Sequence, residues 1–554
     1  MNLKPDWRTL LSSLLIVFAF PPWDFSPLIW VALIPWFLAL ERAGTKTNAF
    51  IQAVWFSFFM SIGGFYWVAH VLQQFGNLPW PLAILGLLLF ALFNELQFLV
   101  FAPLFVSVQK YLRTCTSALW IVAAGLFSGL LYTGLDWILP KLFVDTLGHA
   151  FYASKLLRQS TDIGGPAILT LAVFLVNFSV WAFYSQLKKR QQPSIWPAFR
   201  MNIPHVIVSV VYVGSLLTYG YFREKFVTEQ IDKTPRTVQL GVVQGNIGDF
   251  EKVAAERGFR GAGEKILETM FTLSDQALST NPKLDALVWP ETTYPSTFRT
   301  PDTAEELYRD QRVERFARER GVPILFGGYD HSSGKDYNAF FFLAPNGETG
   351  SDLQIYRKHI LLLFGEYIPG SEQIKLIRQI FPQVANFGRG IGPEVLTIPN
   401  TTKKPKTDKV KVGPIICYEA LFPNYIIAAA RQGSQMILNI TNDSWFGPYG
   451  EPQLHLALSA FRSIETRLPQ VRSTNTGISA LILPNGEIVQ QTGVSKAEVM
   501  NLSVPILNPI PTLMISWGDW FGPTAFGLGI GFFASLYLLS WLAERRKLTQ
   551  LLKT

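Results

Sequence analysis

The sequence predicts a polytopic α-helical membrane bundle joined to a polar α/β domain that folds as a layered sandwich. Of its 554 residues, 49% are hydrophobic and 16% are charged, against about 25% charged in typical soluble proteins. The apolar residues are concentrated towards the two ends of the chain, and a long polar stretch separates them. This composition excludes a disordered, fibrous or ordinary cytosolic protein. Two cysteines also exclude a disulfide scaffold or a structural zinc module.

About eight apolar stretches are long enough, or nearly so, to cross a hydrocarbon core about 30 Å thick. Seven of them precede the polar stretch and one follows it. They are residues 7–22, 26–41, 50–72, 80–108, 117–139, 165–187, 203–222 and 522–543. The first two are short and are joined by Pro21-Pro22-Trp23, so a re-entrant hairpin is the alternative for this pair.

The distribution of Lys and Arg predicts the orientation, because these residues are enriched in cytoplasmic connections. With the N-terminus inside, the outer connections carry three cations before residue 223: Lys141, Lys155 and Arg158. The inner connections and the tail carry fourteen: Lys4, Arg8, Arg42, Lys46, Lys110, Arg113, Lys188, Lys189, Arg190, Arg200, Arg545, Arg546, Lys547 and Lys553. The basic tail is therefore expected to rest on anionic lipid and not on nucleic acid.

Three domains follow from this count of crossings. Residues 1–223 are predicted to form a transmembrane domain with seven spans. Residues 224–515 are predicted to form an extracytoplasmic domain, and residues 516–554 the eighth span and a cytoplasmic tail. Both termini would then lie in the cytoplasm.

The polar domain alternates short β-rich runs with amphipathic helical ones, which is typical of an α/β layered sandwich. The expected strands are Thr237–Val243, Ala286–Trp289, Pro323–Gly327, Val410–Cys417 and Met436–Ile440. The expected helices cover about residues 258–280, 302–320, 419–432 and 452–467. Two Pro-Asn-Gly turns, at 345–347 and 484–486, each stand between apolar runs and predict hairpins.

Cys417 is the first candidate catalytic residue. It follows a predicted strand and precedes a helical segment that begins near Glu419. A nucleophile at such a turn is held out of the sheet, near backbone N–H groups that can bind an oxyanion. The helix N-terminus is also expected to favour the thiolate. The alternative is a buried, inert cysteine.

Two charged residues are candidate partners of this thiol. Glu291 follows an apolar strand, where a partly desolvated carboxylate can serve as a general base. Lys358 stands in Tyr356-Arg-Lys-His and could stabilise both a thiolate and a tetrahedral oxyanion. Taken singly, Glu291 also fits a helix or turn cap, and Lys358 a solvated surface charge.

In their local strings, these residues resemble the nitrilase (carbon–nitrogen hydrolase) superfamily, from about Val238 to Val489. The other matching strings are Phe364-Gly-Glu-Tyr-Ile-Pro369, Cys417-Tyr-Glu419, Asn442-Asp-Ser-Trp-Phe-Gly447 and Arg462-Ser-Ile-Glu465. The resemblance implies a nitrilase-like four-layer αββα sandwich and a triad of Glu291, Lys358 and Cys417.

Seven spans, an outer nitrilase-like domain and one last span are together similar to the apolipoprotein N-acyltransferase family, over nearly the whole chain. Members transfer an acyl chain from a phospholipid to the α-amino group of the diacylglyceryl-cysteine at a lipoprotein's N-terminus. The resemblance implies a thioester acyl-enzyme, a phospholipid donor, an apolipoprotein acceptor, and no metal or organic cofactor. It also implies a monomer in the bacterial inner membrane, surrounded by membrane lipids, with no nucleic-acid partner.

The same resemblance implies supporting roles for four further residues. Glu366 and Glu419 are expected to position Lys358 and the active-site charges, although Glu419 also fits a helix N-terminal charge. Tyr418 and Trp445 are expected to line the substrate pocket, with ordinary core packing as the alternative.

Several other features have weaker implications. The apolar segment 364–393 is a candidate lid, with a surface loop as the alternative. His70 and His455 lack, in the sequence, the clustering of metal ligands. The chain departs from the family at Ile247-Gly-Asp-Phe-Glu-Lys252, where a Lys-Trp pair is common, and at Leu362-Leu363, where Val-Pro is common.

Two other functions stay open on the sequence. A membrane-anchored nitrilase-like amidase would release ammonia from a small amide, but it would have little use for eight spans. A non-catalytic lipid-binding or sensory protein on an inactive scaffold is the other, and the presence of Glu291, Lys358 and Cys417 together argues against it.

Overall fold

The computed structural model describes residues 3–551, apart from 75, 77, 115–116, 190–195, 249–260, 346–352, 371–372, 375–384 and 400–408. Cys115, Lys252 and the middle of segment 364–393 lie outside the described residues. The chain forms two compact units. The first comprises Met1–Phe65, Leu87–Gly220 and Asp519–Thr554, and the second comprises Tyr66–Gly86 and Tyr221–Gly518.

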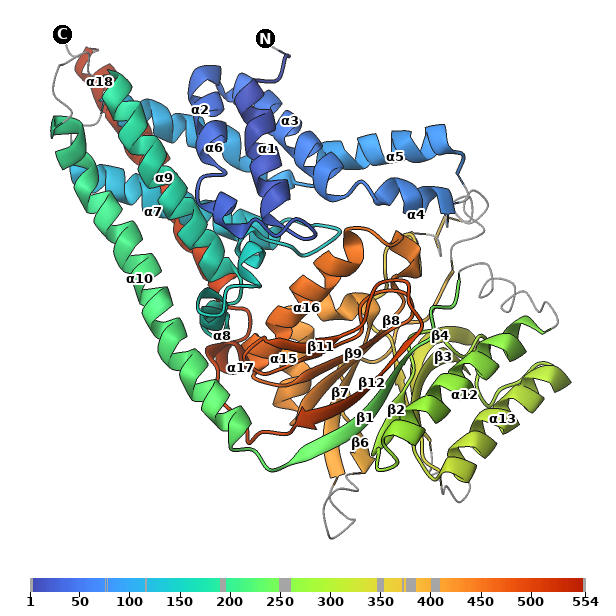
Figure 1. The fold of residues 1–554 in the computed structure, drawn as a ribbon. Coiled ribbons are helices and arrows are strands. Elements are labelled where there is room, and N and C mark those ends of the chain that lie inside the picture. The colour runs from blue at the N-terminus through green and yellow to red at the C-terminus, as the bar shows by residue number, and fades with distance from the viewer. Residues whose placement is uncertain are drawn as a thin grey trace. The chain divides into compact units, whose positions relative to one another are not determined.

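The helices of the N-terminal and C-terminal regions are long and apolar (Figure 1). Their bounds are α1 (Trp7–Ala19), η1 (Ser26–Trp30), α2 (Ile34–Ala43), α3 (Lys46–Gly64), α4 (Val68–Gln74), α5 (Trp80–Phe93), α6 (Leu96–Thr114), α7 (Ala118–Ile138), η2 (Leu147–Phe151), η3 (Leu157–Ser160), α8 (Thr161–Gly164), α9 (Ala167–Lys189), α10 (Trp196–Asp232) and α18 (Phe521–Leu551).

Among the described residues, six helical segments are long and apolar enough to cross a membrane. A seventh is added if α3 and α4, which meet at a bend of 65°, form one broken span. The remaining predicted segment, 7–22, is the shorter apolar helix α1. These findings confirm the predicted polytopic bundle. Helix α10 runs to Asp232, about ten residues beyond the predicted span 203–222.

Aromatic packing and one buried amide stabilise the first unit. The Trp36 ring stacks on Phe56 with centroids 4.8 Å apart and meets the edge of Phe98 at 5.2 Å. Asn177 on α9 donates from Nδ2 to the carbonyl of Ile29 (3.0 Å) and accepts from the N–H of Leu33 (2.8 Å). In hydrocarbon, backbone groups left free at a helix break must find protein partners, and Asn177 supplies two of them between η1 and α2.

The second unit contains two six-stranded sheets. The first has the order β12-β1-β2-β3-β4-β5, with bounds β1 (Thr237–Gln244), β2 (Ala286–Val288), β3 (Ile324–Ser332), β4 (Lys335–Leu343), β5 (Leu353–Arg357) and β12 (Glu498–Pro505). The second has the order β11-β10-β9-β8-β7-β6, with bounds β6 (Leu396–Pro399), β7 (Lys409–Ile416), β8 (Met436–Thr441), β9 (Gln470–Thr474), β10 (Ala480–Ile482) and β11 (Ile488–Gln491).

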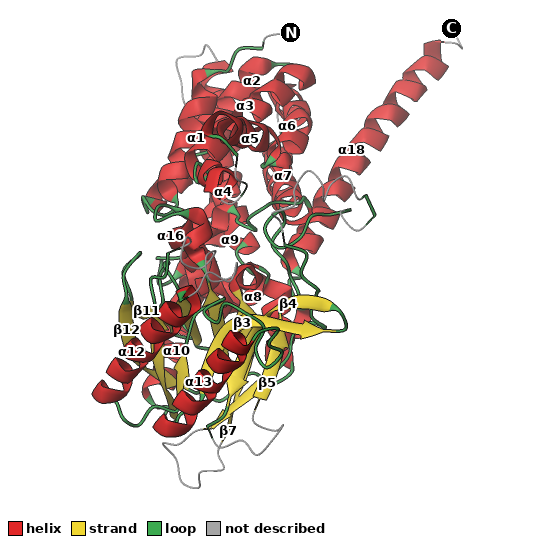
Figure 2. Cartoon of the chain, turned by 90° about the vertical axis from the view of Figure 1, so that its right-hand side faces the viewer, coloured by secondary structure: helices red, strands yellow, loops and turns green. Residues whose placement is uncertain are grey.

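Helices cover the outer face of each sheet, which completes the αββα sandwich. Helices α12 (Ala262–Thr280) and α13 (Ala304–Arg320) lie side by side on the first sheet (Figure 1, Figure 2). Their shared core is aromatic, because Phe271 stacks on Phe316 at 4.6 Å and also contacts Trp289. On the second sheet lie α15 (Pro423–Arg431) and α16 (Glu451–Thr466), which precede the short α17 (Leu513–Trp517).

The predicted strands and hairpins are confirmed with small changes of bounds. Strands β4 and β5 pair antiparallel across the 345–347 turn, of which Asn346 and Gly347 lie outside the described residues. Strands β10 and β11 pair antiparallel across the 484–486 turn. Strands β7 and β8 are parallel, so their carboxyl ends meet at one edge of the sheet.

Candidate active site

Glu291 is held by strand β3, its neighbour in the first sheet. The N–H of Gly327 donates to the carbonyl of Pro290 (3.1 Å), and the N–H of Tyr294 donates to the carbonyl of Gly327 (2.9 Å). These bonds enclose the turn that carries Glu291, and Thr292 within it has φ of 50°. A Cβ on Gly327 would lie 2.5 Å from the Cα of Glu291. The turn therefore packs so closely on β3 that only glycine fits beneath it.

Lys358 lies between two buried carboxylates. Its Nζ donates to Glu366 Oε1 at 2.8 Å and to Glu291 Oε1 at 3.3 Å, and all three residues are at most 7% exposed. Both carboxylates raise the pKa of Lys358 against the opposing effect of its burial. A buried charge is costly unless it is paired, and the Lys358 ammonium is paired with two carboxylates. The lysine is therefore protonated and acts as a hydrogen-bond donor.

Asn338 on β4 bridges the same two carboxylates. Its Nδ2 donates to Glu291 Oε1 at 2.7 Å and to Glu366 Oε1 at 2.8 Å. The backbone N–H of Lys358 also donates to the Asn338 carbonyl at 2.9 Å. The sequence analysis missed Asn338 because a lone asparagine in an apolar strand carries no local signal. Its one clue is that it directly precedes the buried apolar run 339–343 of β4.

Cys417 lies at the sharp turn where β7 ends and the 3₁₀ helix η4 (Cys417–Leu421) begins. Its φ of 51° is in the left-handed region, which non-glycine residues rarely adopt away from functional turns. The side chain is 6% exposed. The structure thus places Cys417 at the turn after a strand that the sequence predicts, and its role as nucleophile stays a prediction.

The expected effect of a helix N-terminus, which would favour the thiolate, is outweighed at Cys417. Burial raises the pKa of Cys417 well above its ordinary value, and the charges of Glu291 and Asp443 raise it further, while Lys358 opposes them. The predicted helix N-terminus is a five-residue 3₁₀ turn, which is too short to outweigh desolvation. The site therefore holds a thiol with a carboxylate nearby to receive its proton.

Glu419 ties the loop after β5 to the end of β7. Its carboxylate accepts from the N–H of His359 (2.8 Å), the N–H of Ile360 (3.1 Å) and the N–H of Ile416 (2.8 Å), and from the Tyr356 hydroxyl (2.6 Å). Burial raises the pKa of Glu419 despite these bonds. Glu419 thus joins the residues beside Lys358 to the residue before Cys417. This role differs from the alternative interpretation of Glu419 as a charge at a helix N-terminus.

The two predicted substrate-pocket residues, Tyr418 and Trp445, lie in the short helices that follow the neighbouring strands β7 and β8. Tyr418 is 6% exposed and meets the ring of Phe422 edge-on at 5.1 Å. Trp445 is partly buried in η5 (Asp443–Phe446), the 3₁₀ helix that follows β8. Their positions are compatible with a pocket wall, and their contact with substrate stays a prediction.

A buried charge cluster lies behind β8. Asp443, Glu451 and His455 place ligand-type atoms within 4.8 Å of one another, so His455 is clustered in space although not in sequence. Arg472 Nη2 lies 3.1 Å from Asp443 Oδ2 and 2.9 Å from His455 Nδ1. Because this guanidinium supplies a positive charge at the centre of the cluster, we interpret these residues as an ion-pair network and not as a metal site.

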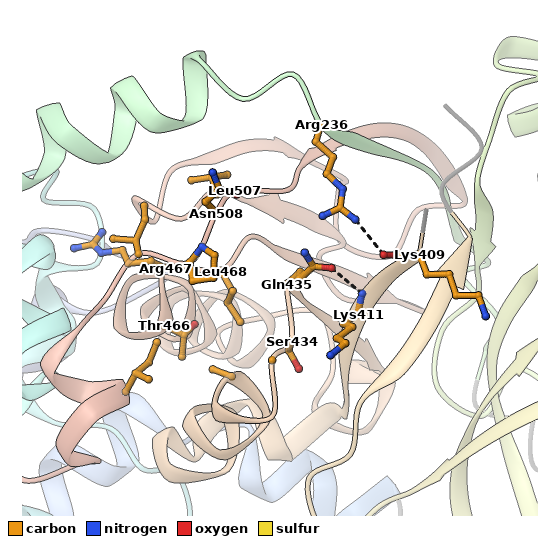
Figure 3. Close-up of a pocket in the computed structure, with 15 residues that line it drawn as sticks. Arg236, Lys409, Lys411, Ser434, Gln435, Thr466, Arg467, Leu468, Leu507 and Asn508 are labelled. Atoms are coloured by element: carbon orange, nitrogen blue, oxygen red, sulfur yellow. Dashed lines mark hydrogen bonds between the residues drawn. The ribbon is translucent and has the colours of Figure 1, made fainter. Parts of the chain in front are cut away.

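A cavity of about 350 Å³ in this unit lies at the amino end of β7. Arg236, Lys409, Lys411 and Arg467 contribute to its lining, with apolar side chains such as Leu468 and Leu507. Figure 3 shows that Lys409 extends away from the cavity and that the Arg467 guanidinium points aside, where it donates to the Pro484 carbonyl at 3.1 Å. The cations thus do not converge on one point, and the cavity lies at the opposite end of β7 from Cys417.

Comparison with known proteins finds two family models along the chain. The model described as "Apolipoprotein N-acyltransferase N-terminal domain" matches residues 12–179, and the model described as "Carbon-nitrogen hydrolase" matches residues 239–505. A solved structure of a carbon-nitrogen hydrolase from Helicobacter pylori G27 is 16% identical with a TM-score of 0.36, and covers 49% of this chain and 90% of that chain.

Full-length relatives are also similar to this chain. An apolipoprotein N-acyltransferase from Bdellovibrio bacteriovorus is 31% identical over 541 residues, which cover 93% of this chain and 91% of that protein. One from Geobacter metallireducens is 27% identical, over 89% of this chain and 88% of that protein. One from Chlorobaculum tepidum is 26% identical, over 91% of each.

Proposed function

Because this chain belongs to the apolipoprotein N-acyltransferase family, we propose that it transfers an acyl chain from a phospholipid to an apolipoprotein. The acceptor is the N-terminal α-amino group of an S-diacylglyceryl-cysteine. The observation that carries the proposal is the buried set of Glu291, Lys358 and Glu366, joined within 3.3 Å beside a thiol whose pKa the charges of Glu291 and Lys358 influence. Such a set is suited to covalent acyl transfer and not to ligand binding alone.

In the first half-reaction, Glu291 takes the Cys417 proton as the sulfur attacks the ester carbonyl of the phospholipid. Lys358 and the backbone N–H near Tyr418 stabilise the resulting oxyanion. The tetrahedral intermediate collapses, and the C–O bond of the ester breaks. The departing lysophospholipid oxygen takes the proton from Glu291, and a thioester remains on Cys417.

In the second half-reaction, the α-amine of the acceptor attacks the thioester. Glu291 accepts the proton of the amine, and the C–S bond breaks as the amide forms. The thiolate of Cys417 then recovers its proton from Glu291, which restores the resting site. Two sequential half-reactions through one covalent intermediate predict ping-pong kinetics.

The other site residues position this set. We propose that Glu366 orients Lys358, that Glu419 holds the loop of Lys358 against the end of β7, and that Tyr418 and Trp445 line the substrate pocket. No step requires a metal or an organic cofactor. The enzyme is proposed to act as a monomer.

The apolar helices and the family place the chain in the bacterial inner membrane. We propose that residues 224–515 form the catalytic domain on the periplasmic side, between the seven-span domain 1–223 and the last span with its cytoplasmic tail, 516–554. The distribution of Lys and Arg supports this orientation. A membrane site suits the donor, because each acyl CH₂ brought into water costs about 0.8 kcal/mol.

The test is intact-protein mass spectrometry of the detergent-purified full chain after incubation with phosphatidylethanolamine. We expect wild-type protein to gain the mass of one acyl chain and to lose it on treatment with hydroxylamine. Cys417→Ala should gain none. Unmodified wild-type protein with unconsumed lipid would overturn the proposal and favour the amidase or the non-catalytic protein.

A further inference from the structure

The end of strand β8 places a hydroxyl group beside the nucleophile. Strands β7 and β8 pair in parallel with Ile416 opposite Ile440. The next residues along the chain are therefore Cys417, directly after β7, and Thr441, the last residue of β8. Thr441 is fully buried, and its hydroxyl lies close enough to the Cys417 sulfur to lower the pKa of that thiol as a hydrogen-bond donor.

The same hydroxyl has a second acceptor. Thr441 Oγ1 lies 3.2 Å from Asp443 Oδ1 and donates to it. A hydroxyl has one proton to donate, so it can serve the carboxylate or the sulfur at one time, but not both fully. Which acceptor it serves depends on which of the two carries charge.

The ion-pair network allows Asp443 to lose the hydrogen bond from the Thr441 hydroxyl at little cost. Arg472 Nη2 lies 3.1 Å from Asp443 Oδ2 and 3.4 Å from Oδ1, and His455 Nδ1 lies 3.1 Å from Oδ1. Burial alone would raise the pKa of Asp443, but the charges of Arg472 and His455 lower it to about 2. The carboxylate thus stays ionised and keeps charged partners when the Thr441 hydroxyl turns away.

Glu451, the fourth member of the network, favours the protonated state, whereas Asp443 favours the ionised one. Burial and the nearby Asp443 charge raise the pKa of Glu451 to about 7. Glu451 is therefore the carboxyl group that binds a proton most readily, and Asp443 the permanent anion. The carboxylate of Asp443 is also packed tightly, because a Cβ on Gly477 would lie 2.0 Å from its Oδ2.

We propose that Thr441 is a switching hydrogen-bond donor to the nucleophile. Its hydroxyl donates to Asp443 while the Cys417 sulfur is a neutral thiol or thioester, and it turns to the sulfur whenever a thiolate forms. It would thus stabilise the attacking thiolate of the first half-reaction and the departing thiolate of the second. Thr441 exchanges no proton, since Glu291 takes the Cys417 proton in the first half-reaction and returns a proton to the sulfur in the second. The role in both half-reactions rests on the proposed function, whereas the effect on the free thiolate does not.

Alkylation of Cys417 by iodoacetamide tests this without any lipid, because only the thiolate reacts. The rate is measured against pH on the detergent-purified full chain, by mass spectrometry of the peptide that contains Cys417. The charged groups facing that sulfur are Glu291, Lys358 and Asp443, and all three stay unchanged in the variants. We expect Thr441→Val to shift the midpoint of the profile upward by about one pH unit, which lowers the rate at neutral pH about tenfold.

Thr441→Ser keeps the hydroxyl and should restore the wild-type profile. Thr466→Val is the matched control, because its buried hydroxyl donates to the backbone carbonyl of Arg462 at 2.7 Å and faces a different end of the fold. A Thr441→Val profile identical to wild type would overturn the proposal. So would a Thr441→Ser profile as shifted as that of Thr441→Val, because packing would then explain the effect.

If Thr441→Val does not purify as folded protein, Thr441→Ala compared with Thr441→Ser makes the same test. Failure of the proposed function is distinguishable from failure of this inference. Wild-type protein that alkylates with the expected profile but never forms an acyl adduct would overturn the acyltransferase and leave the switching donor standing.

Discussion

Asn338 connects two carboxylates that would otherwise repel each other across Lys358. One Nδ2 group serves both Glu291 and Glu366, at 2.7 and 2.8 Å. Two like charges sharing one lysine are stable only if further donors satisfy their oxygens. The Asn338 amide therefore fixes the positions of Glu366 and of Glu291, the proposed general base. It acts on these carboxylates and not on substrate.

Replacement of Asn338 by Ala should slow acyl-enzyme formation about 10- to 100-fold, because a lost hydrogen bond to a charged group is worth about 1.5–3 kcal/mol. Asn338→Asp should be slower still, because it adds a third carboxylate to the cluster. The measurement is the rate at which the acyl adduct appears in intact-mass spectra. Asn501→Ala is the control, since its amide donates to the backbone of Ala277 on α12, and unchanged kinetics are expected there.

The pH dependence of Cys417 alkylation should report the charges around it. The negative charge of Glu291 raises the pKa of Cys417, and the positive charge of Lys358 lowers it. Glu291→Gln should therefore move the alkylation midpoint down, and Lys358→Met should move it up, each by about one pH unit or more. Glu314→Gln, on a surface ion pair with Arg299, should leave it in place. Shifts of Glu291→Gln and Lys358→Met in the same direction would contradict this assignment of charges.

At the residue scale, sequence reasoning selected Cys417, Glu291 and Lys358, which the structure brings together, because each stands in a distinctive local string. It did not find Asn338 or Thr441. Their importance comes from strand pairing, which brings together residues far apart in the chain. Thr441 even matches a glycosylation sequon, Asn439-Ile-Thr441, and that local pattern says nothing of the sulfur on the adjacent strand. The effect of burial on the pKa of Cys417 was missed, because burial cannot be read from the neighbours in sequence.

At the scale of elements, strand β3 acts as the support on which the Glu291 turn rests. Gly327→Ala would place a methyl group 2.5 Å from the Cα of Glu291 and 2.6 Å from the N of Thr292. Both are backbone atoms, so the turn must shift as a whole. We expect destabilisation of about 1–3 kcal/mol and at least a tenfold loss of acyl-enzyme formation, measured by thermal unfolding and intact mass. Gly214→Ala on α10, where no atom lies within 4 Å of the added carbon, should change neither.

Strands and hairpins were predictable because alternation, apolar runs and Pro-Asn-Gly turns are local signals. The residues at which helices begin and end were less predictable from the sequence. Helix α10 continues past Phe222 to Asp232, because a helix that has already formed extends through polar residues at little cost. The helix predicted after Cys417 is instead a 3₁₀ turn followed by α15, which begins at Pro423, since a proline is favoured at the first position of a helix.

At the scale of the whole molecule, the proposed orientation predicts which positions an impermeant reagent can reach. In a chain without native cysteines, Ser279→Cys on α12 should be labelled by a membrane-impermeant maleimide in intact spheroplasts. Thr47→Cys, in the first turn of α3, should be labelled only after permeabilisation. Both side chains are exposed, so accessibility within the fold does not bias the comparison. The reverse pattern would invert the topology derived from the Lys and Arg distribution.

The second unit begins with Tyr66–Gly86, far from the rest of it in sequence. Trp67 meets the ring of Phe446 edge-on at 5.2 Å, and His70 lies against Gly447, so this short piece supports the loop that carries Asp443 and Trp445. During translation it is made before most of the membrane helices, and its partner loop is made after them. A fragment that begins at residue 221 would thus lack a segment that packs against its own 443–450 loop, and in the full chain the contacts of Trp67 and His70 with this loop must wait until residues 443–450 have been synthesised.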